Sequence, residues 1–548
     1  MSWRTFVSPQ FGVPFWVAVL TVALFAYQNK FGSNIPVADE WDVTPHLRQC
    51  VNANRVPQWV ATRHNEHYYP LARAVYAAVM VASGYHFHSG MIASVLALGL
   101  AALTFVSAAR RLRGCALWAD LLIPALLLNW GAGDNVTMGY QLAFTLEVLA
   151  AAFAVWVVVS DRGGRRWDVA ATFAAVGLAL NGVAGLLAAA PLLGWVLYRS
   201  ERSHAPRWWK AAVSDLPTAA VVAYGLWATG GGDRTPGLSS PVQSPVQLSR
   251  ATGQFLAVGF GTCVVTGNWL APAGVAVAIY GACGVVLTRR VLTRPAGRAG
   301  ALGLAAILVG VFGMAAGVGW GRGFGLVERY VSLSAVGLGT AWLVLSRGLP
   351  NSRLVNAMGV VAAVVLFAVN VTPGDHFGQV RRMYCRELEE SVREGLPPSC
   401  VADRFRGPLF DNPRFGEKLG LLRDLGFATF SDLPAEPVAV AVEGPPPTAG
   451  VVGSPLSLLS PAGRRVFAVR FTYETAADVG WQQLTFSWTG ADGTPRRSAV
   501  YPSLRRGAHA STIYVNDAVA AAHLSVGTPE AGLTVARVEW LCAAGAGD

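Results

Sequence analysis

The stretch Ile35–Leu71 gathers the side chains of this sequence that are best suited to chemistry. Its acids and histidines are Asp39, Glu40, Asp42, His46, His64, Glu66 and His67. Charged residues make up only 14% of the chain, and this stretch lies between two apolar segments. Ionisable groups are costly to place beside a bilayer, so their density here predicts a functional site.

The acids come first, in the motif VADEWD, which contains Asp39, Glu40 and Asp42. A carboxylate in such a place can accept a proton from a reacting hydroxyl, and desolvation or a nearby cation can tune its pKa for that task. The same side chains could instead orient a substrate or hold a metal ion. The structural alternative is a solvated loop start, with Asp42 as the N-cap of a helix over Thr44–Asn52.

The second group is His64, Glu66 and His67, in the motif HNEHYYP. In a helix, His64 and His67 would share one face, at a spacing that can bind a divalent metal ion or a phosphate. The spacing provides no third ligand, so a metal stays an open question. The alternative is a polar cap at the membrane interface, with Tyr68 and Tyr69 at the level of the headgroups.

A third group lies far along the chain, where WGRGFGLVERYVS contains Arg322, Arg329 and Tyr330 between two apolar segments. A guanidinium binds phosphate through a bidentate fork. This segment therefore predicts a phosphate-binding site at the membrane edge. The alternative is ordinary interfacial arginines whose charged ends reach water.

A membrane protein must position these groups. The 548 residues are 53% hydrophobic, with a mean hydropathy of +0.41, and the apolar residues occur in long runs. The fold class predicted is a mainly α, polytopic membrane protein, and two further segments, Tyr69–Ser83 and Leu248–Thr266, are expected to lie along the membrane surface. The length of the hydrocarbon core predicts about eleven spans, at Phe11–Tyr27, Gly90–Ala109, Ala116–Trp130, Gly139–Ser160, Val169–Leu180, Val183–Tyr198, Ala211–Thr229, Leu270–Thr288, Ala301–Trp320, Tyr330–Ser346 and Leu354–Val371.

The basic residues predict the orientation. Although the net charge is +11, the arginines gather in alternate loops, at 110–113, 162–166, 199–210, 289–298 and 347–353. The positive-inside rule then puts the N-terminus in the cytoplasm and the loops at 35–71, 131–138, 230–269 and 321–329 outside, together with everything after Val371. This pattern explains the charge by membrane orientation and argues against nucleic acid as a partner.

The composition changes after Val371 to that of a soluble domain. We expect residues 1–371 to form the membrane domain, with an outer loop at 29–89, and residues 372–432 to form a mixed helical segment. A Pro-rich linker over 433–452 would lead to a β-sandwich over 453–548, where apolar and polar residues alternate between turns. Cys385 and Cys400 are candidates for a disulfide, because this part would lie in an oxidising compartment.

The acidic pair in VADEWD, just after the first predicted span, resembles the pair that GT-C superfamily membrane glycosyltransferases carry in their first outer loop. The surface helix that follows, the number of spans and the outer C-terminal domain are similar too, and the resemblance covers the first half of the chain best. It implies that Asp39 is the base that deprotonates an acceptor. Glu40 and Asp42 would then orient the acceptor or hold a metal ion.

The resemblance also gives a role to Asp134, in GAGDNVTMG. Superfamily members often place another acid in the second outer loop, where it completes an acceptor or metal site. A single aspartate beside Asn135 departs from an Asp-x-Asp form, and Gly131 and Gly133 equally support a plain turn. Arg322 or Arg329, with Tyr330, would hold the donor phosphate in such enzymes.

The expected function is transfer of a sugar from a polyprenyl-phosphate carrier to a lipid, glycan or protein acceptor, on the outer face of a bacterial inner membrane. The resemblance is to mannosyltransferases and aminoarabinose transferases of this kind. Membrane lipids are expected partners; no cofactor is required with certainty, and a divalent metal stays open. One rival is a transporter of lipid-linked glycans, which would need ionisable residues along the interior of its spans. The middle positions of the predicted spans are nearly free of charge, with Glu147 as the main exception, and this argues against a transporter. The other rival is a non-catalytic scaffold.

Overall fold

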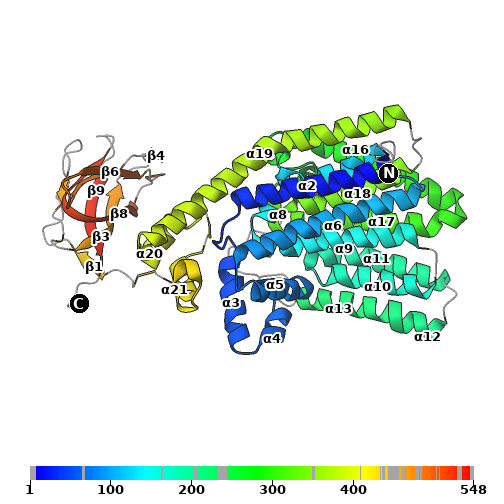
Figure 1. Cartoon of the computed structure of the whole chain (residues 1–548), viewed down its shortest axis with the longest axis horizontal. Coiled ribbons are helices and arrows are strands. Elements are labelled where there is room, and N and C mark those ends of the chain that lie inside the picture. The colour runs from blue at the N-terminus through cyan, green and yellow to red at the C-terminus, as the bar shows by residue number, and fades with distance from the viewer. Residues whose placement is uncertain are drawn as a thin grey trace. The chain divides into compact units, whose positions relative to one another are not determined.

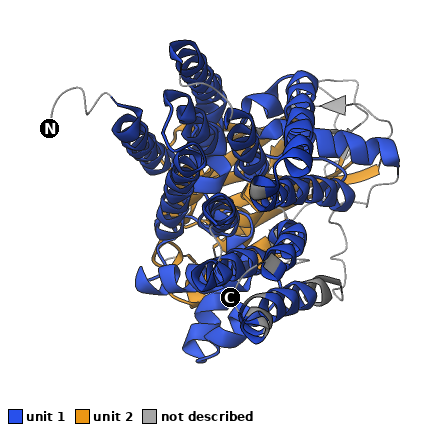
Figure 2. Ribbon diagram, turned by 90° about the vertical axis from the view of Figure 1, so that its right-hand side faces the viewer, with its two compact units in different colours: residues 1–383 blue, residues 384–548 orange. Residues whose placement is uncertain are grey.

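The structure is a computed structural model with two compact units, Met1–Met383 (unit 1) and Tyr384–Asp548 (unit 2), which are coloured separately in Figure 2. It describes residues 8–64, 68–161, 164–202, 206–230, 244–347, 352–407, 409–410, 412–431, 433–434, 438–441, 456–458, 461, 464–475, 480–481, 484–500, 503–504, 507–526 and 533–543. Unit 1 is a bundle of helices, seen nearly end-on in Figure 2.

Long helices build unit 1 (Figure 1). They are α2 (Pro9–Phe31), α6 (Phe87–Arg113), α9 (Leu142–Ser160), α10 (Arg165–Ala179), α11 (Val183–Arg202), α13 (Leu216–Gly230), α14 (Pro245–Val258), α16 (Leu270–Thr293), α17 (Arg298–Arg322), α18 (Val331–Ser346) and α19 (Arg353–Arg393), which continues into unit 2. Short helices join them: α3 (Glu40–Asn52), α4 (Val56–Ala61), α5 (Pro70–Ala82), α7 (Leu122–Leu127), α8 (Gly133–Val136), α12 (Arg207–Lys210) and α15 (Cys263–Thr266). Single turns complete the unit: η1 (Trp118–Leu121), η2 (Trp130–Ala132), η3 (Gly139–Gln141), η4 (Ala211–Asp215), η5 (Pro295–Gly297) and η6 (Glu328–Tyr330).

Within the described ranges, seven helices are long and apolar enough to cross a membrane. They are Pro9–Phe31, Phe87–Arg113, Gly139–Ser160, Val183–Glu201, Leu270–Thr293, Arg298–Arg322 and Arg353–Arg393. The predicted class, a mainly helical polytopic membrane protein, is confirmed. The count of eleven stays a prediction, because α10 and α18 have only 15 and 16 residues.

The predicted span Ala116–Trp130 is not one continuous helix. It divides into η1, α7 and η2. Asn129 ends α7, because its side-chain amide donates hydrogen bonds to the carbonyls of Ala125 and Leu126 while its side-chain oxygen accepts one from the N–H of Gly131. The side chain of Asn129 thus competes for backbone groups and interrupts an apolar run whose composition predicts a span.

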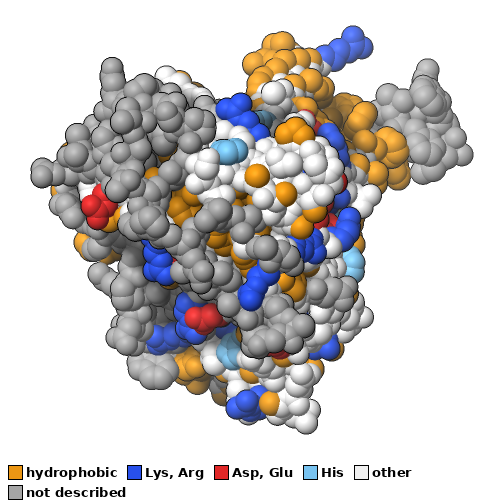
Figure 3. Space-filling view, turned by 90° about the vertical axis from the view of Figure 1, so that its left-hand side faces the viewer, with side chains coloured by type: hydrophobic (Ala, Val, Ile, Leu, Met, Phe, Trp, Pro, Cys, Tyr) orange, Lys and Arg blue, Asp and Glu red, His pale blue; other side chains and the backbone are white. Residues whose placement is uncertain are grey.

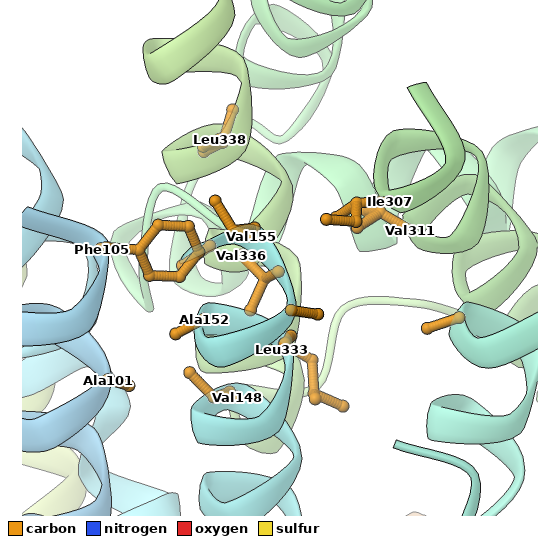
Figure 4. Packing of buried hydrophobic residues seen from close by; sticks show 14 of the residues in the cluster. Ala101, Phe105, Val148, Ala152, Val155, Ile307, Val311, Leu333, Val336 and Leu338 are labelled. Carbon is orange, nitrogen blue, oxygen red and sulfur yellow. The ribbon is translucent and has the colours of Figure 1, made fainter. Parts of the chain in front are cut away.

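The core of unit 1 is apolar and closely packed (Figure 4). Phe105 of α6 lies beside Val155 of α9 and Val336 of α18, and all three are at most 1% exposed. Many of the other buried positions of these helices are alanine or glycine, such as Ala152 and Gly337. Small residues let helix backbones approach closely, which is how membrane helices associate without a hydrophobic driving force between them.

Helices α3, α4 and α5 lie at the end of the bundle where α2 ends and α6 begins (Figure 1). The surface segment predicted over Tyr69–Ser83 is the helix α5. The helix predicted over Thr44–Asn52 begins earlier, at Glu40, and Asp39 occupies its N-cap position. The structural alternative for Asp42 is therefore wrong, because Asp42 lies in the first turn of α3.

The basic ends of several helices meet one another. Arg113, at the end of α6, donates hydrogen bonds to both carboxylate oxygens of Asp120 and to Oγ of Ser346, at the end of α18. Arg199, near the end of α11, likewise donates to Asp161 and Asp168. These buried pairs tie together the loops in which arginines gather in the sequence.

The helix α19 runs through the point where the composition changes. Pro373 lies inside it, and the predicted helical segment at 379–394 is its continuation. Here Tyr27 Oη donates a hydrogen bond to the carbonyl of Gly374 at 2.8 Å. The division between the two units falls after Met383, within this helix.

Unit 2 combines helices and an antiparallel sheet. Its further helices are α20 (Pro398–Phe405), α21 (Phe415–Asp424) and the turn η7 (Ala428–Phe430). Its strands are β1 (Val438–Ala441), β2 (Leu456–Leu458), β3 (Arg465–Thr475), β4 (Gly480–Trp481), β5 (Leu484–Gly490), β6 (Pro495–Val500), β7 (Ser503–Leu504), β8 (Gly507–Val526) and β9 (Leu533–Cys542). β1 lies within the stretch predicted as a linker and pairs with β9.

The strand order is β1-β9-β3-β8-β5-β6, with β2 also paired to β8 and with β4 paired to β7. The first part of β8 pairs with β3 and its second part with β5, so this one strand joins the two halves of the sheet. Phe471, Phe486, Trp488 and Trp540 share the core between them. The antiparallel C-terminal domain is confirmed, and Trp488 belongs to its core; the side chains of Trp481 and Tyr501 lie outside the described part.

On the face shown in Figure 3, the described Lys and Arg side chains are more widespread than Asp and Glu, in keeping with the net charge of +11. Cys385 and Cys400 are both buried in unit 2 and both are thiols in the structure. The disulfide expected between them is therefore not formed in it.

Candidate functional site

The first acid of the VADEWD motif lies beside a histidine. Asp39 follows Ala38, whose φ of 48° is uncommon for a residue other than glycine and turns the chain into α3. Nε2 of His64 lies 3.5 Å from Oδ1 of Asp39, and 38% of the aspartate side chain is exposed against 13% of the histidine. The structure therefore brings together two predicted site residues that are 25 positions apart, and leaves the carboxylate accessible.

The second acid has a different environment. Glu40 is fully buried, and its carboxylate accepts hydrogen bonds from the N–H of Val37 at 3.0 Å, from the N–H of Tyr140 at 3.2 Å and from Oη of Tyr76 at 3.4 Å. Burial raises the pKa of Glu40 to about 8, although these hydrogen bonds oppose the change. Glu40 therefore holds the site loop against α5 and η3, and is not presented to a substrate.

Tyr140 closes the space behind Asp39 and His64. Its ring contacts those of His64 and Tyr76 edge-on, with centroids 5.5 Å and 5.2 Å away. Its hydroxyl is buried and has no hydrogen-bond partner among the described residues. Arg73 lies nearby, since its charge acts on Tyr140, and its guanidinium stacks over Trp59 at 4.0 Å. This aromatic wall orients the histidine.

The other acids and histidines of this stretch are Asp42, His46, Glu66 and His67. Asp42 is half-buried in the first turn of α3, and His46 is exposed. Glu66 and His67, predicted as acceptor or metal ligands, lie outside the described residues. Their roles stay predictions.

Asp134, in the helix α8, forms an ion pair that the sequence did not suggest. Its Oδ1 lies 2.8 Å from Nη2 of Arg381, on α19, and both side chains are less than one-fifth exposed. The next residue, Asn135, donates through Nδ2 to the carbonyl of Arg329 at 3.2 Å and to Oγ of Ser332. The segment that contains Asp134 and Asn135 is thus tied both to α19 and to the segment that contains Arg329.

Arg329 lies within the electrostatic reach of both acids. Burial lowers its pKa, but Tyr330, Asp134 and Asp39 raise it, and the balance is upward. Arg329 therefore stays a cation, and Asp39 is among the groups whose charge acts on it. The neighbouring Glu328 has a pKa raised by burial and further by Asp134, while Arg381 and Arg329 oppose the change.

The other two residues of that segment differ from Arg329. Tyr330 is 4% exposed and packs between Phe144 and Phe255, so it belongs to the core and supports the cation from behind. Arg322 is half-buried at the last turn of α17, before Gly323 caps the helix with a φ of 69°. The charges of Asp39 and Asp134 act on Arg329, one of the two predicted phosphate-binding arginines.

No three His, Cys, Asp or Glu side chains are placed to share a metal ion anywhere in the described ranges. Asp39, His64 and Asp134 alone do not form such a set, and Glu66 and His67 lie outside the described ranges.

Sequence reasoning missed Arg381 and Tyr140. Arg381 lies 247 positions after Asp134 in a segment that reads as an ordinary charged helix, and no local spacing joins the two. Tyr140 carried a weak signal, because it follows directly on the glycine-rich loop that contains Asp134. Both residues contribute through long-range contacts, which only the fold provides.

The class of protein is thus a multi-pass membrane protein with acidic, basic and aromatic side chains gathered at one end of its helical bundle. No family model and no curated protein matches this chain. Among solved structures it is similar to the crystal structure of ArnT from Cupriavidus metallidurans bound to undecaprenyl phosphate, at 15% identity over 76% of each chain, with a TM-score of 0.39. A likeness this distant has no bearing on the roles of individual residues.

Proposed function

We propose that this protein is a glycosyltransferase that moves a sugar from a polyprenyl-phosphate carrier to an acceptor hydroxyl at the outer face of a bacterial inner membrane, with its N-terminus in the cytoplasm. One observation carries the proposal. A partly exposed carboxylate, Asp39, lies beside His64 and within the electrostatic reach of the half-buried cation Arg329. A base and a phosphate-binding group are thus adjacent, beside an apolar bundle that suits a lipid carrier.

The proposed reaction forms one bond, breaks another and moves one proton, and Asp39 and Arg329 each have one part in it. The acceptor oxygen attacks the anomeric carbon of the sugar with inversion, and a new C–O bond forms as the bond to the phosphate oxygen breaks. Asp39 takes the proton of the acceptor hydroxyl. The electron pair of the broken bond leaves with the polyprenyl phosphate, whose second negative charge develops beside Arg329. Stabilising that charge is the kind of contribution that is usually largest in catalysis.

The other residues act as supports. Glu40 fixes the loop from within, since its three hydrogen bonds reach Val37, Tyr140 and Tyr76. His64 orients the carboxylate of Asp39. The acceptor and the sugar are not specified by any local motif, because the cavity that would select them is built from several loops.

The test is sugar transfer in reconstituted vesicles from a mixed pool of polyprenyl-phosphate sugars, with Asp39→Asn compared with the wild type. We expect the variant to lose transfer by about two to four orders of magnitude while it still binds the donor, because removing a general base affects the chemical step. Equal transfer by the two proteins would reject Asp39 as the base. Donor binding by both without transfer by either would reject the enzyme class.

A transporter of lipid-linked glycans is the second candidate, and Glu147 is the observation that favours it. This acid is 2% exposed on α9, its Oε1 has no hydrogen-bond partner among the described residues, and it lines a small apolar cavity with Ala151 and Ile307. An isolated acid inside a membrane bundle is typical of proton-coupled transport. If Glu147→Gln abolishes flipping of a labelled carrier and leaves transfer absent in both proteins, the transporter replaces the enzyme.

A further inference from the structure

The helix α19 forms one wall of the site, although its sequence reads as a connection to the C-terminal part. Arg382 donates through Nη1 to the carbonyl of Gly32 at 2.6 Å, and Tyr27 Oη donates to the carbonyl of Gly374 at 2.8 Å. Both partners on the other side belong to the end of α2 or directly follow it. The turn of α19 that contains Arg381 is therefore held against the segment that leads into the Asp39 loop.

Only some of the guanidinium nitrogens of Arg381 have partners among the described residues. Nη2 is paired with Asp134, and the group lies 4.8 Å from the centroid of the Phe377 ring. Nη1 is buried and has no hydrogen-bond partner among the described residues. Leaving a guanidinium N–H buried and unpaired costs free energy, so an acceptor atom from a ligand would be stabilised there. The side chain as a whole is 18% exposed, although Nη1 itself is buried.

Arg329, in η6, also has a buried guanidinium nitrogen without a hydrogen-bond partner among the described residues. Its Nε is buried without a hydrogen-bond partner in the described part of the chain. Asp134 pairs with Arg381 and its charge acts on Arg329, and the side chain of the next residue, Asn135, donates to the carbonyl of Arg329 at 3.2 Å. Both arginines therefore lie close to the same short segment. Asp39, the other acid near Arg329, has His64 beside it. Two guanidinium groups with unused donors and one shared carboxylate are suited to a multiply charged oxyanion.

We propose that Arg381 is a phosphate-binding residue, and that it and Arg329 together hold the phosphate of the polyprenyl carrier on either side of Asp134. This inference rests on the proposed function for the identity of the anion. Asp134 then keeps the two arginines apart and competes with the phosphate for Arg381. The phosphate gains a second negative charge when the sugar leaves, so the second guanidinium stabilises the product side of the reaction most.

The test measures binding of polyprenyl phosphate without sugar, and of neutral polyprenol of the same length, to the full-length protein in phosphatidylcholine vesicles. Wild type is compared with Arg381→Ala, Arg381→Gln and Asp134→Asn. The matched control is Arg386→Ala, which removes one positive charge from the same helix at a position whose side chain is 67% exposed. Melting temperatures identify any variant that fails to fold, and the glutamine variant keeps most of the side-chain volume.

We expect Arg381→Ala and Arg381→Gln to weaken binding of the phosphate by about tenfold to a hundredfold, the size of a hydrogen bond to a charged group. Polyprenol binding and the Arg386→Ala variant should be unchanged. Asp134→Asn should bind the phosphate as tightly as the wild type or more tightly, because it removes the competing carboxylate. The affinity for polyprenyl phosphate should thus fall in the Arg381 variants and not in Asp134→Asn, and this difference distinguishes direct phosphate binding by Arg381 from a purely structural role.

Three results would overturn the inference. Arg381→Ala could behave like Arg386→Ala, or Arg381→Ala and Asp134→Asn could weaken binding equally, which would mean that Arg381 only supports Asp134. Phosphatidylglycerol could compete as well as polyprenyl phosphate, which would identify a general site for lipid headgroups. A wild type that binds polyprenol as well as polyprenyl phosphate would instead overturn the proposed function itself, so the two failures are distinct.

Discussion

Oε1 of Glu40 accepts a hydrogen bond of 3.2 Å from the N–H of Tyr140, one hundred residues later in the chain. This contact joins the start of α3 to η3, next in the chain to the partly exposed carboxylate of Asp39. The two members of the acidic pair therefore have separate tasks. Asp39 is partly exposed beside His64, and Glu40 is buried and fixes the loop from within.

The buried Glu40 should make the stability of the protein depend on pH. Its pKa is raised from 4.5 to about 8 by burial, so folding favours the protonated form. The contribution is fully present below about pH 4.5 and is lost as the pH rises towards 8. We expect the melting temperature of the wild type to fall relative to Glu40→Gln between pH 5 and pH 8. A constant difference between the two proteins over that range would contradict a buried, protonated Glu40.

Gly139 should not tolerate a side chain. A Cβ there would lie 2.7 Å from Oε1 of Glu40 and 3.1 Å from the carbonyl of Phe87. We expect Gly139→Ala to cost about 1 to 3 kcal/mol of stability by forcing these groups apart, and to lower transfer by displacing Asp39. Gly281→Ala on α16 is the matched control, because a Cβ at that position meets no atom within 4 Å. Similar melting temperatures for the two variants would show that the close approach is absent.

The pairing of His64 with Asp39 predicts that their effects on the rate are not additive. His64→Ala should slow transfer by roughly tenfold, because the histidine orients the base without replacing it. In the background of Asp39→Asn, the same change should add little. Single-turnover rates of the two single variants and the double variant test this. If the effects of the two substitutions on the transfer rate were fully additive, Asp39 and His64 would act independently.

The opposite end of the bundle should matter for stability alone. Asp120 is fully buried and accepts hydrogen bonds from Arg113, from the N–H of Leu117 and from Nε1 of Trp342. Replacing it with alanine leaves Arg113 buried without its counter-charge, which typically costs about 3 to 5 kcal/mol. We expect a large fall in melting temperature, with the affinity for polyprenyl phosphate unchanged in the folded fraction. Loss of that affinity at a temperature where the variant is folded would contradict this separation.

Much of the fold could be predicted from local patterns. Apolar runs of sufficient length indicated the long helices α2, α6, α9, α16 and α17, because a helix that spans a bilayer needs about twenty apolar residues wherever it lies in the chain. Alternation of apolar and polar residues indicated the antiparallel sheet of unit 2, because successive side chains of a strand point to opposite faces of the sheet. The interruption at Asn129 was missed, since it depends on one side chain that competes for backbone groups.

For the candidate site, the sequence by itself determined which segments contain the acids, the histidines and the arginines. The density of acids and histidines in Ile35–Leu71, and the arginines at 322 and 329, follow from residue type and position alone. Only the tertiary structure decided which members of those groups meet. Asp39 and Glu40 are neighbours in the chain, yet one is exposed and the other buried, and Arg381 reaches Asp134 across 247 positions. Burial and electrostatic contact depend on distance in space, and distance along the chain does not encode it.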